Sequence, residues 1–394
     1  MRRTSLLLFG LVVTVLVALG LVVLSSASQA NGVRLHGDAY FFMRRQFEYL
    51  VAALLVGIAA AWFDYRRWRD HAGLAVVFYG VVFVLLLAVF LFPQVNGSWR
   101  WIKCGPLRLQ PSEFAKLATV ILVSVYLDRI GWRVELFLKG AVWPAIFIGL
   151  IAAPVLFEPD FGSVMVIGLA GALVMFVAGV RILHLGALAL PAVGVVAYKV
   201  ATNANRMARL FAFVGSRQTA ADGVAKAVDP AAQAAQYQAE QALVAIRNGG
   251  MFGVGLGKSM QKQLYLPEAH TDFIFAVGAE ELGLLFSISV VLLFMAVFAF
   301  SVYIARRSTD RLGKFLALGM GFIIFFQAMF NLGVVCEALP TKGMALPFFS
   351  YGGTNLLSAF FAVGTIFSVG IHSSGDRNLL RKVSTDSLKE SHDR

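Results

Sequence analysis

Apolar residues run along this chain in long blocks, and polar residues gather in the stretches between them. A helix needs roughly 20 apolar residues to cross a bilayer, and ten blocks reach or approach that length. The blocks cover residues 5–24, 47–63, 74–92, 113–128, 140–157, 161–180, 182–200, 273–304, 313–337 and 350–372. The pattern predicts an all-α, polytopic membrane protein with about ten transmembrane helices.

The same pattern predicts one transmembrane domain over residues 1–394, with two polar segments. Residues 201–270 form a large extracytoplasmic loop between helices seven and eight, and 374–394 form a polar cytoplasmic tail. Within the loop, Asp229 and Pro230 indicate the start of a helix over 231–247, and Gly249 or Gly250 its end. We expect the apolar side chains of that helix to face the membrane domain; these are Ala242, Val244, Ala245 and Ile246.

Composition excludes a soluble protein, because 59% of residues are apolar, 14% are charged and the mean hydropathy is +0.75. With a cytoplasmic N-terminus, the inward-facing segments hold 18 Lys and Arg residues and the short outer loops hold 7. Positive residues favour the cytoplasmic side, so both termini are predicted inside and the long loop outside. The net charge of +12 suits contact with anionic lipids, and nothing in the sequence indicates a nucleic-acid partner.

Ionisable residues gather where the long loop meets the eighth apolar block: Glu268, His270, Asp272 and Glu280. Charges beside hydrocarbon are costly, so they mark a functional site by default. Asp272 heads a stripe of small residues that continues through Ala276, Ala279 and Gly283. The alternative for Asp272 is a helix-start carboxylate whose pKa the helix dipole lowers.

Residues 111–117 read PSEFAKL and indicate a helix start with Ser112 as its cap. Glu113 and Lys116 are three residues apart and can pair on one face. That pair could simply make Lys116 tolerable at the membrane edge. Equally, Lys116 could offer its charge to a phosphate.

Two further sets of charged residues each allow a structural and a functional interpretation. Asp160 is favoured as the cap of the sixth helix, although with Glu158 it could orient a sugar or hold a divalent cation. Arg206 and Arg209 share one face of a loop segment, where they either extend to the interface or contact a diphosphate.

The remaining loops carry few charges. The run GGMFGVGLGKS fails both nucleotide-binding patterns, so its glycines are predicted to permit tight turns and close backbone approach. Residues 339–355, with a lone Lys342, are predicted to form a re-entrant turn. Gln327 and Asn331 are expected to hydrogen-bond between helices. No disulfide is expected between Cys104 and Cys336.

Several motifs occur in a fixed order from the fourth block onward: PSEFAKL, EPDFG, an Arg-x-x-Arg segment, LPEAHTDFIFAV with EELG, and LPTKG followed by LPFFSYGG. Together they resemble the SEDS family of peptidoglycan glycosyltransferases, which includes FtsW, RodA and SpoVE, and they are more similar to the FtsW branch. The resemblance implies polymerisation of lipid II outside the bacterial cytoplasmic (inner) membrane during cell division, with undecaprenyl diphosphate as the leaving group.

The resemblance also implies roles for particular residues. Asp272 matches the family's presumed catalytic residue. Candidates for substrate binding are Lys116, Arg206, Arg209, Glu268, His270 and Lys342, and candidates for support are Glu113, Asp160 and Glu280. A divalent cation, Mg or Mn, could assist, although the metal ligands are unknown. The implied partners are lipid II, a class B penicillin-binding protein transpeptidase, other divisome membrane proteins and membrane lipids.

Two other functions remain open at this stage. A lipid II flippase would need polar groups through the bilayer and discontinuous helices, whereas the ionisable residues here gather at the outer lip. A division scaffold would need no chemistry, and the outer motif argues against it.

Overall fold

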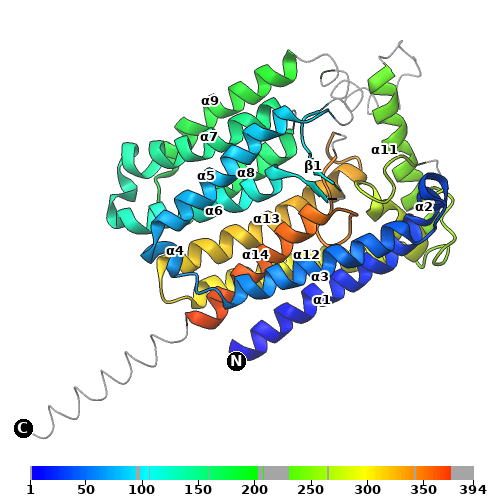
Figure 1. Cartoon of the computed structure of the whole chain (residues 1–394), viewed down its shortest axis with the longest axis horizontal. Helices are drawn as coiled ribbons and strands as arrows, with labels where there is room; N and C mark the ends of the chain where they lie inside the picture. The colour runs from blue at the N-terminus through cyan, green and yellow to red at the C-terminus, as the bar shows by residue number, and fades with distance from the viewer. Residues whose placement is uncertain are drawn as a thin grey trace, which may run out of the picture.

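The computed structural model contains a bundle of long helices with a small polar layer at one end (Figure 1). It describes residues 2–94, 98–105, 107–158, 160–202, 207, 230–263, 266–340 and 343–373. Helix α1 begins and α14 ends at the same end of the bundle (Figure 1). We call this the inner end and the opposite one the outer end, after the orientation predicted from charge.

The element order follows the predicted alternation of long apolar helices and short connections. In the first half, the elements are α1 (Arg2–Ala27), α2 (Gln29–His36), α3 (Phe41–Trp62), α4 (Arg67–Asp70), α5 (Ala72–Ala88), the 3-10 turn η1 (Val89–Leu91), β1 (Ile102–Cys104), β2 (Leu107–Leu109) and α6 (Pro111–Ile130). In the second half, they are η2 (Gly131–Glu135), η3 (Phe137–Val142), α7 (Trp143–Phe157), α8 (Phe161–Ala178), α9 (Ile182–Ala201), α11 (Pro230–Gly249), α12 (Ile274–Arg307), α13 (Arg311–Val335) and α14 (Gly353–His372).

Among the described residues, nine helices are long and apolar enough to cross a membrane. They correspond to nine of the ten predicted blocks, so the all-α membrane architecture is confirmed. Helix α6 corresponds to the remaining block and is 20 residues long, but it is not among the nine. It carries two charged residues near each end, and most of its side chains are buried inside the bundle.

Burial divides the helices into an interior and a lipid-facing set. The spanning windows of α13 and α14 are 72% and 78% buried, whereas that of α9 is 0% buried. Helix α14 packs along α3, and α12 packs along α13. The polar segments near Asp272 are therefore held by the best-packed helices, while α9 lies at the edge of the bundle (Figure 1).

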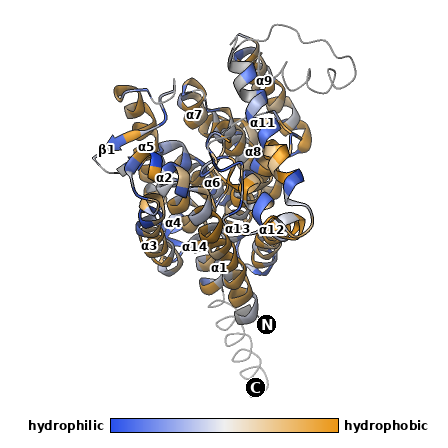
Figure 2. Cartoon of the chain, turned by 90° about the vertical axis from the view of Figure 1, so that its right-hand side faces the viewer, coloured by the Kyte–Doolittle hydropathy of each residue, from blue (hydrophilic) through white to orange (hydrophobic). Residues whose placement is uncertain are grey.

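The outer end carries α2, a two-stranded antiparallel ribbon of β1 and β2, and α11. Figure 2 looks onto this end and shows α11 with mixed polarity against mostly hydrophobic helices. The predicted helix 231–247 is confirmed, and Gly250 follows it with φ +52. Ala242 and Ala245 are buried as expected, but Val244 is exposed, so that part of the prediction was wrong. Asp229 lies outside the described residues.

Helix α12 is interrupted at Gly283, where φ is 77 and ψ is −167. The interruption ends the predicted small-residue stripe, although Ala276 and Ala279 are buried as expected. The rings of Phe275 and Phe286 lie 6.3 Å apart across the break. The sequence did not predict this break, because apolar residues continue on both sides of Gly283 and indicate one helix through the whole block.

The glycine-rich loop after α11 fills the break with its own backbone. The carbonyls of Glu280 and Glu281 accept hydrogen bonds from the amides of Val254 and Gly255, both at 3.0 Å. In return, the Leu284 amide donates to the carbonyl of Gly250 at 2.9 Å. Buried backbone groups freed by a broken helix need such partners. The prediction that these glycines allow close backbone approach is confirmed, because a Cβ at Gly253 would collide with the Glu281 carbonyl.

Candidate active site

Asp272 lies in the turn that leads into α12, two residues before the helix begins at Ile274. The segment 344–350 is buried between helices, and it and the residue that follows it form hydrogen bonds with this turn. The Tyr351 amide donates to the His270 carbonyl at 3.0 Å, and Ser350 Oγ donates to the Thr271 carbonyl at 2.6 Å. The irregular, buried backbone agrees with the predicted re-entrant turn.

The backbone carbonyl of Asp272, which follows those of His270 and Thr271, accepts a hydrogen bond from Asn331 Nδ2 at 2.8 Å. The same amide nitrogen donates to the Met344 carbonyl at 2.6 Å, so Asn331 joins the two segments. Gly343 then faces the Asp272 carboxylate, and a Cβ there would collide with Oδ2. The expected role of Asn331 as a polar link between helices is confirmed, and the Asp272 carboxylate is confined on that side.

Burial raises the pKa of Asp272 to about 7, and the nearby charge of Glu268 acts in the same direction. The charge of Asp160 raises it further, whereas Arg100 lowers it. The alternative interpretation, a carboxylate whose pKa the helix dipole lowers, is not favoured, because loss of water around the carboxylate raises its pKa. Part of the Asp272 residue is nevertheless accessible to solvent. A carboxylate with a pKa near neutrality that still reaches solvent can accept a proton from a substrate.

Glu268 and His270 flank Asp272 but differ in environment. Glu268 is exposed, has φ 55 and accepts a hydrogen bond from Thr271 Oγ1 at 2.8 Å. The His270 ring lies 4.8 Å from Phe42, and its Nδ1 lies 3.1 Å from Asn31 Nδ2. Burial lowers the pKa of His270, so the ring is neutral at physiological pH. His270 therefore links the turn to α2 and α3, while Glu268 faces the solvent.

Asp160 caps α8 as predicted, because its carboxylate accepts from the Ser163 amide at 3.3 Å and from Ser163 Oγ at 2.7 Å. Ser112 does not cap α6, so that prediction was wrong. The N-cap is Gln110, with Pro111 in the first turn. Ser112 Oγ instead donates toward Asp160 at 3.4 Å.

Glu158 is fully buried beside Asp160, and neither of its carboxylate oxygens has a hydrogen-bond partner among the residues that the structure describes. Burial raises the pKa of Glu158 to about 9, with a further contribution from the charge of Asp160. Arg100 approaches from the outer loop, where its Nε donates to the Glu158 carbonyl at 3.4 Å. Glu158 is thus a neutral acid at physiological pH.

Glu113 and Lys116 form the predicted ion pair, with 2.8 Å between Oε2 and Nζ. Both side chains are buried, and Lys116 Nζ also donates to Gln327 Oε1 at 2.6 Å. Ser358 Oγ donates to the Glu113 carboxylate at 2.9 Å. The observed contacts favour the pairing role of Lys116 over the alternative of a charge left available for a phosphate.

Glu280 and its neighbour Glu281 are buried at the break in α12 and hold the glycine-rich loop. Glu280 accepts hydrogen bonds from Ser259 Oγ and from the Gln261 amide. Glu281 forms an ion pair with Lys262 Nζ at 3.0 Å and accepts from Ser26 Oγ of α1 at 2.6 Å. Glu280 therefore supports the loop that leads to Asp272, which agrees with its predicted supporting role.

Three predicted binding residues, Arg206, Arg209 and Lys342, lie outside the described residues. Across the part of the chain that the structure describes, no three His, Cys, Asp or Glu side chains converge closely enough to hold a metal ion. Glu158 and Asp160 are two carboxylates and do not by themselves make up such a group, and no step below depends on a metal cation.

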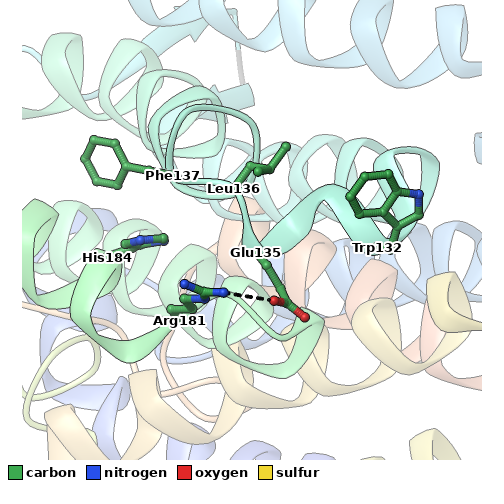
Figure 3. Close-up of a pocket in the computed structure, with 6 residues that line it drawn as sticks. All are labelled: Trp132, Glu135, Leu136, Phe137, Arg181 and His184. Carbon is green, nitrogen blue, oxygen red and sulfur yellow. Dashed lines mark hydrogen bonds and ion pairs between the residues drawn. The ribbon is translucent and has the colours of Figure 1, made fainter.

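A separate cavity lies at the inner end, between the η2–η3 connection and the start of α9 (Figure 3). Its lining residues are Trp132, Glu135, Leu136, Phe137, Arg181 and His184. Arg181 points toward Glu135 and pairs with it at 3.2 Å, and both side chains are largely exposed. The cavity is far from Asp272 along the bundle and shares no residue with the outer site.

Sequence reasoning missed the approach of Arg100 to Glu158 and the pairing of Lys262 with Glu281. The sequence places Arg100 in an outer loop with two Trp and two other cations, a composition that fits either an interfacial belt or contact with an anionic lipid head group. One signal for the contact between Lys262 and Glu281 is present in the sequence. Two consecutive carboxylates in an apolar block need a cation nearby, and Lys262 lies in the polar stretch that precedes the block.

Comparisons with known proteins agree with this arrangement. A family model described as a cell cycle protein and named for FtsW, RodA and SpoVE matches residues 6–375. The chain is 36% identical over 359 residues to the probable peptidoglycan glycosyltransferase FtsW of Coxiella burnetii, covering 90% of this chain and 93% of that protein. It is 38% identical over 365 residues to the protein of the same name from Thioalkalivibrio sulfidiphilus, covering 91% and 87%.

Two solved structures share the fold. A chain from a peptidoglycan synthase complex that coordinates polymerization and crosslinking superposes with a TM-score of 0.72 at 24% identity, covering 93% of this chain and 98% of that one. The rod shape determining protein RodA of Thermus thermophilus gives a TM-score of 0.64 at 25% identity, covering 92% and 95%.

Proposed function

The chain belongs to the FtsW/RodA/SpoVE family of cell cycle proteins, and from this membership we propose that it polymerises lipid II into glycan strands as a peptidoglycan glycosyltransferase. Its relatives over most of its length carry the name of that activity. The observation that supports the chemistry is Asp272, a confined carboxylate at the outer end whose pKa is raised to about 7.

Asp272 is the general base in this proposal. It accepts the proton of the acceptor sugar's hydroxyl while the hydroxyl oxygen forms a bond to the anomeric carbon of the donor. The bond from that carbon to undecaprenyl diphosphate breaks at the same time, so the configuration inverts. A base is most effective when its pKa lies near the working pH, and burial brings Asp272 into that range.

The departing diphosphate needs positive charge nearby. Arg100 is close enough to lower the pKa of Asp272, which makes it the described cation best placed for this task. Arg206, Arg209 and Lys342 remain candidates from the sequence. Lys116 is a weaker candidate, because Glu113 and Gln327 already engage its ammonium group. The predicted divalent cation stays a prediction.

Similarity to FtsW proteins supports a role in division, and similarity to a subunit of a peptidoglycan synthase complex supports a crosslinking partner. We propose that this partner is a class B penicillin-binding protein transpeptidase, and that other divisome membrane proteins and membrane lipids contact the helices. Depletion in a rod-shaped host should then give filaments. Rounded cells with normal septa would contradict the division role.

The break in α12 is the feature that a flippase would require. However, the carbonyls of Glu280 and Glu281 and the amide of Leu284 are all bonded to the glycine-rich loop. These backbone groups are therefore already occupied and do not face a passing head group. It supports the loop before Asp272, which favours the enzyme over the transporter.

Purified protein with labelled lipid II and a candidate transpeptidase tests the proposal. Asp272→Asn keeps the size of the side chain but removes the base, which typically costs about 10²–10⁴-fold in rate. Glu240→Gln, an exposed carboxylate on α11, is the matched control and should polymerise normally. Near-normal glycan synthesis by Asp272→Asn, with both variants equally folded, would rule out the assigned base.

Orientation needs its own test. A reporter inserted at Gly223 should read as extracytoplasmic, and one fused after Asp376 as cytoplasmic. If both reporters read on the same side, the predicted ten-helix topology is wrong.

A further inference from the structure

The glycine-rich loop between α11 and Asp272 has an inverted distribution of polarity. Its apolar side chains point outward and are exposed: Met251, Phe252, Val254, Leu256 and Met260. Three of its polar side chains, Ser259, Gln261 and Lys262, point inward and are buried, whereas Lys258 and Gln263 are exposed. A loop surrounded by water shows the opposite arrangement, so a contiguous apolar surface of this kind marks an interaction site.

Helix lengths place this loop at the outer boundary of the hydrocarbon. Thr4 begins the apolar span of α1, and Ser26 lies about 33 Å further along at 1.5 Å per residue. Arg306 marks the inner end of α12, and Gly283 lies about 35 Å away from it. Since the hydrocarbon core is about 30 Å thick, both counts end at its outer edge.

A direct contact shows that the outer end of α1 and the break in α12 lie at the same depth. Ser26 Oγ of α1 donates to the Glu281 carboxylate, two residues before the break, at 2.6 Å. The Leu285 amide, two residues after the break, donates to the Met251 carbonyl at 3.4 Å. The backbone of Met251, which precedes Phe252, is therefore fixed at the depth where α1 leaves the hydrocarbon.

The apolar surface of the loop continues into the lipid-facing surface of α12. Leu284, Leu285 and Ile288 follow the break and are exposed, as expected for side chains that face lipid tails. Leu284 is bonded through its amide to Gly250, at the start of the loop. Lys258 is exposed among the apolar residues, where its stem can lie along the acyl chains and its ammonium can reach the phosphates.

We propose that residues 250–260 insert into the outer leaflet of the membrane, with Phe252 and its apolar neighbours among the upper acyl chains and Lys258 at the head-group phosphates. The occupant of this surface is the lipid bilayer. Insertion keeps the loop against the break in α12 and so fixes the height of the chain that leads to Asp272. The inference needs the membrane topology but not the glycosyl transfer, and its test uses no activity.

The test is depth-dependent quenching in proteoliposomes of phosphatidylethanolamine and phosphatidylglycerol. Phe252→Cys, made in a full-length Cys104→Ser, Cys336→Ser background, carries a polarity-sensitive dye. Met260→Cys is the second position, and Gln263→Cys is the matched control, because Gln263 is exposed and polar on the same loop. Lipids with a nitroxide high on the acyl chain should quench the dye at 252 and 260 several-fold more than at 263. Aqueous iodide should show the reverse order.

Equal quenching at 252, 260 and 263, with ready access for iodide, would overturn the proposal, because the loop would then lie in water. Protection from iodide that arises only after adding a partner protein would also overturn it and would assign the surface to that protein. Because two labelled positions are measured, a dye that disturbs one of them does not decide the result.

Discussion

Asn331 Nδ2 lies 2.8 Å from the backbone carbonyl oxygen of Asp272. A buried side chain of α13 thereby holds the backbone of the residue that we propose as the base. The same nitrogen lies 2.6 Å from the Met344 carbonyl, so one amide group fixes Asp272 relative to the segment that confines its carboxylate.

We expect Asn331→Ala to lower the polymerisation rate by roughly ten- to a hundredfold, because a small displacement of a catalytic group can cost about 10²-fold. Asn331→Asp keeps the shape but replaces the donor with an acceptor, so it should be at least as damaging. Thermal unfolding in detergent separates this effect from loss of fold. Full activity in Asn331→Asp would show that the two hydrogen bonds do not position Asp272.

The pH dependence of the rate follows from the raised pKa of Asp272. Because the base acts in its ionised form, activity should be present above about pH 7 and fall as the pH drops below that value. The Glu268 charge raises this pKa and the Arg100 charge lowers it. Glu268→Gln should therefore move the acid limb to lower pH, and Arg100→Gln should move it to higher pH. If both variants shifted the acid limb in the same direction, the assignment of Asp272 as the base would be contradicted.

The buried pair of Glu113 and Lys116 should matter mainly for folding. Removing one partner of a buried pair costs about 3–5 kcal/mol, because the other charge is left uncompensated. Glu113→Ala should thus be less stable than Glu113→Gln, which can still accept the hydrogen bond from Ser358. The charge-swapped double variant should recover part of the loss, as measured by unfolding temperature. No recovery relative to either single variant would argue against the pairing.

Glu158 predicts a stability that changes with pH. Its pKa rises from 4.5 to about 9 on folding, so the folded state holds a proton that the unfolded state has lost between these values. The contribution is complete below the lower value and is lost as the pH rises toward the higher one. Glu158→Gln should remove this part of the slope in unfolding temperature against pH. An unchanged slope would mean that another group is responsible.

Local patterns predicted much of this molecule. Block length fixed the spanning helices, and the spacing of Glu113 and Lys116 predicted their contact. The carboxylate of Asp160 was recognised as a cap, because a cap acts on residues that follow it directly in the chain. Each of these features depends on neighbours within a few residues.

Contacts between distant residues were not predictable in the same way. Lys262 meets Ser26 across 236 positions, and Arg100 meets Glu158 across 58. The pKa of Asp272 depends on burial by segments far along the chain, so the sequence left open whether it is raised or lowered. The break at Gly283 depends on a loop that supplies replacement hydrogen bonds, which no periodicity records.

Gly253 and Gly283 face each other across the break in α12, where a Cβ on either one would collide with the other segment's backbone. The two positions therefore share a single steric limit and cannot vary independently. Alanine at one of these positions would push the loop away from the break in α12. Alanine at the second position would then find more space than in the native protein. The steric part of the cost of the double substitution should therefore be below the sum of the two single steric costs, whereas the strain of a side chain at φ +80 and φ +77 remains at each position, so both sites still favour glycine.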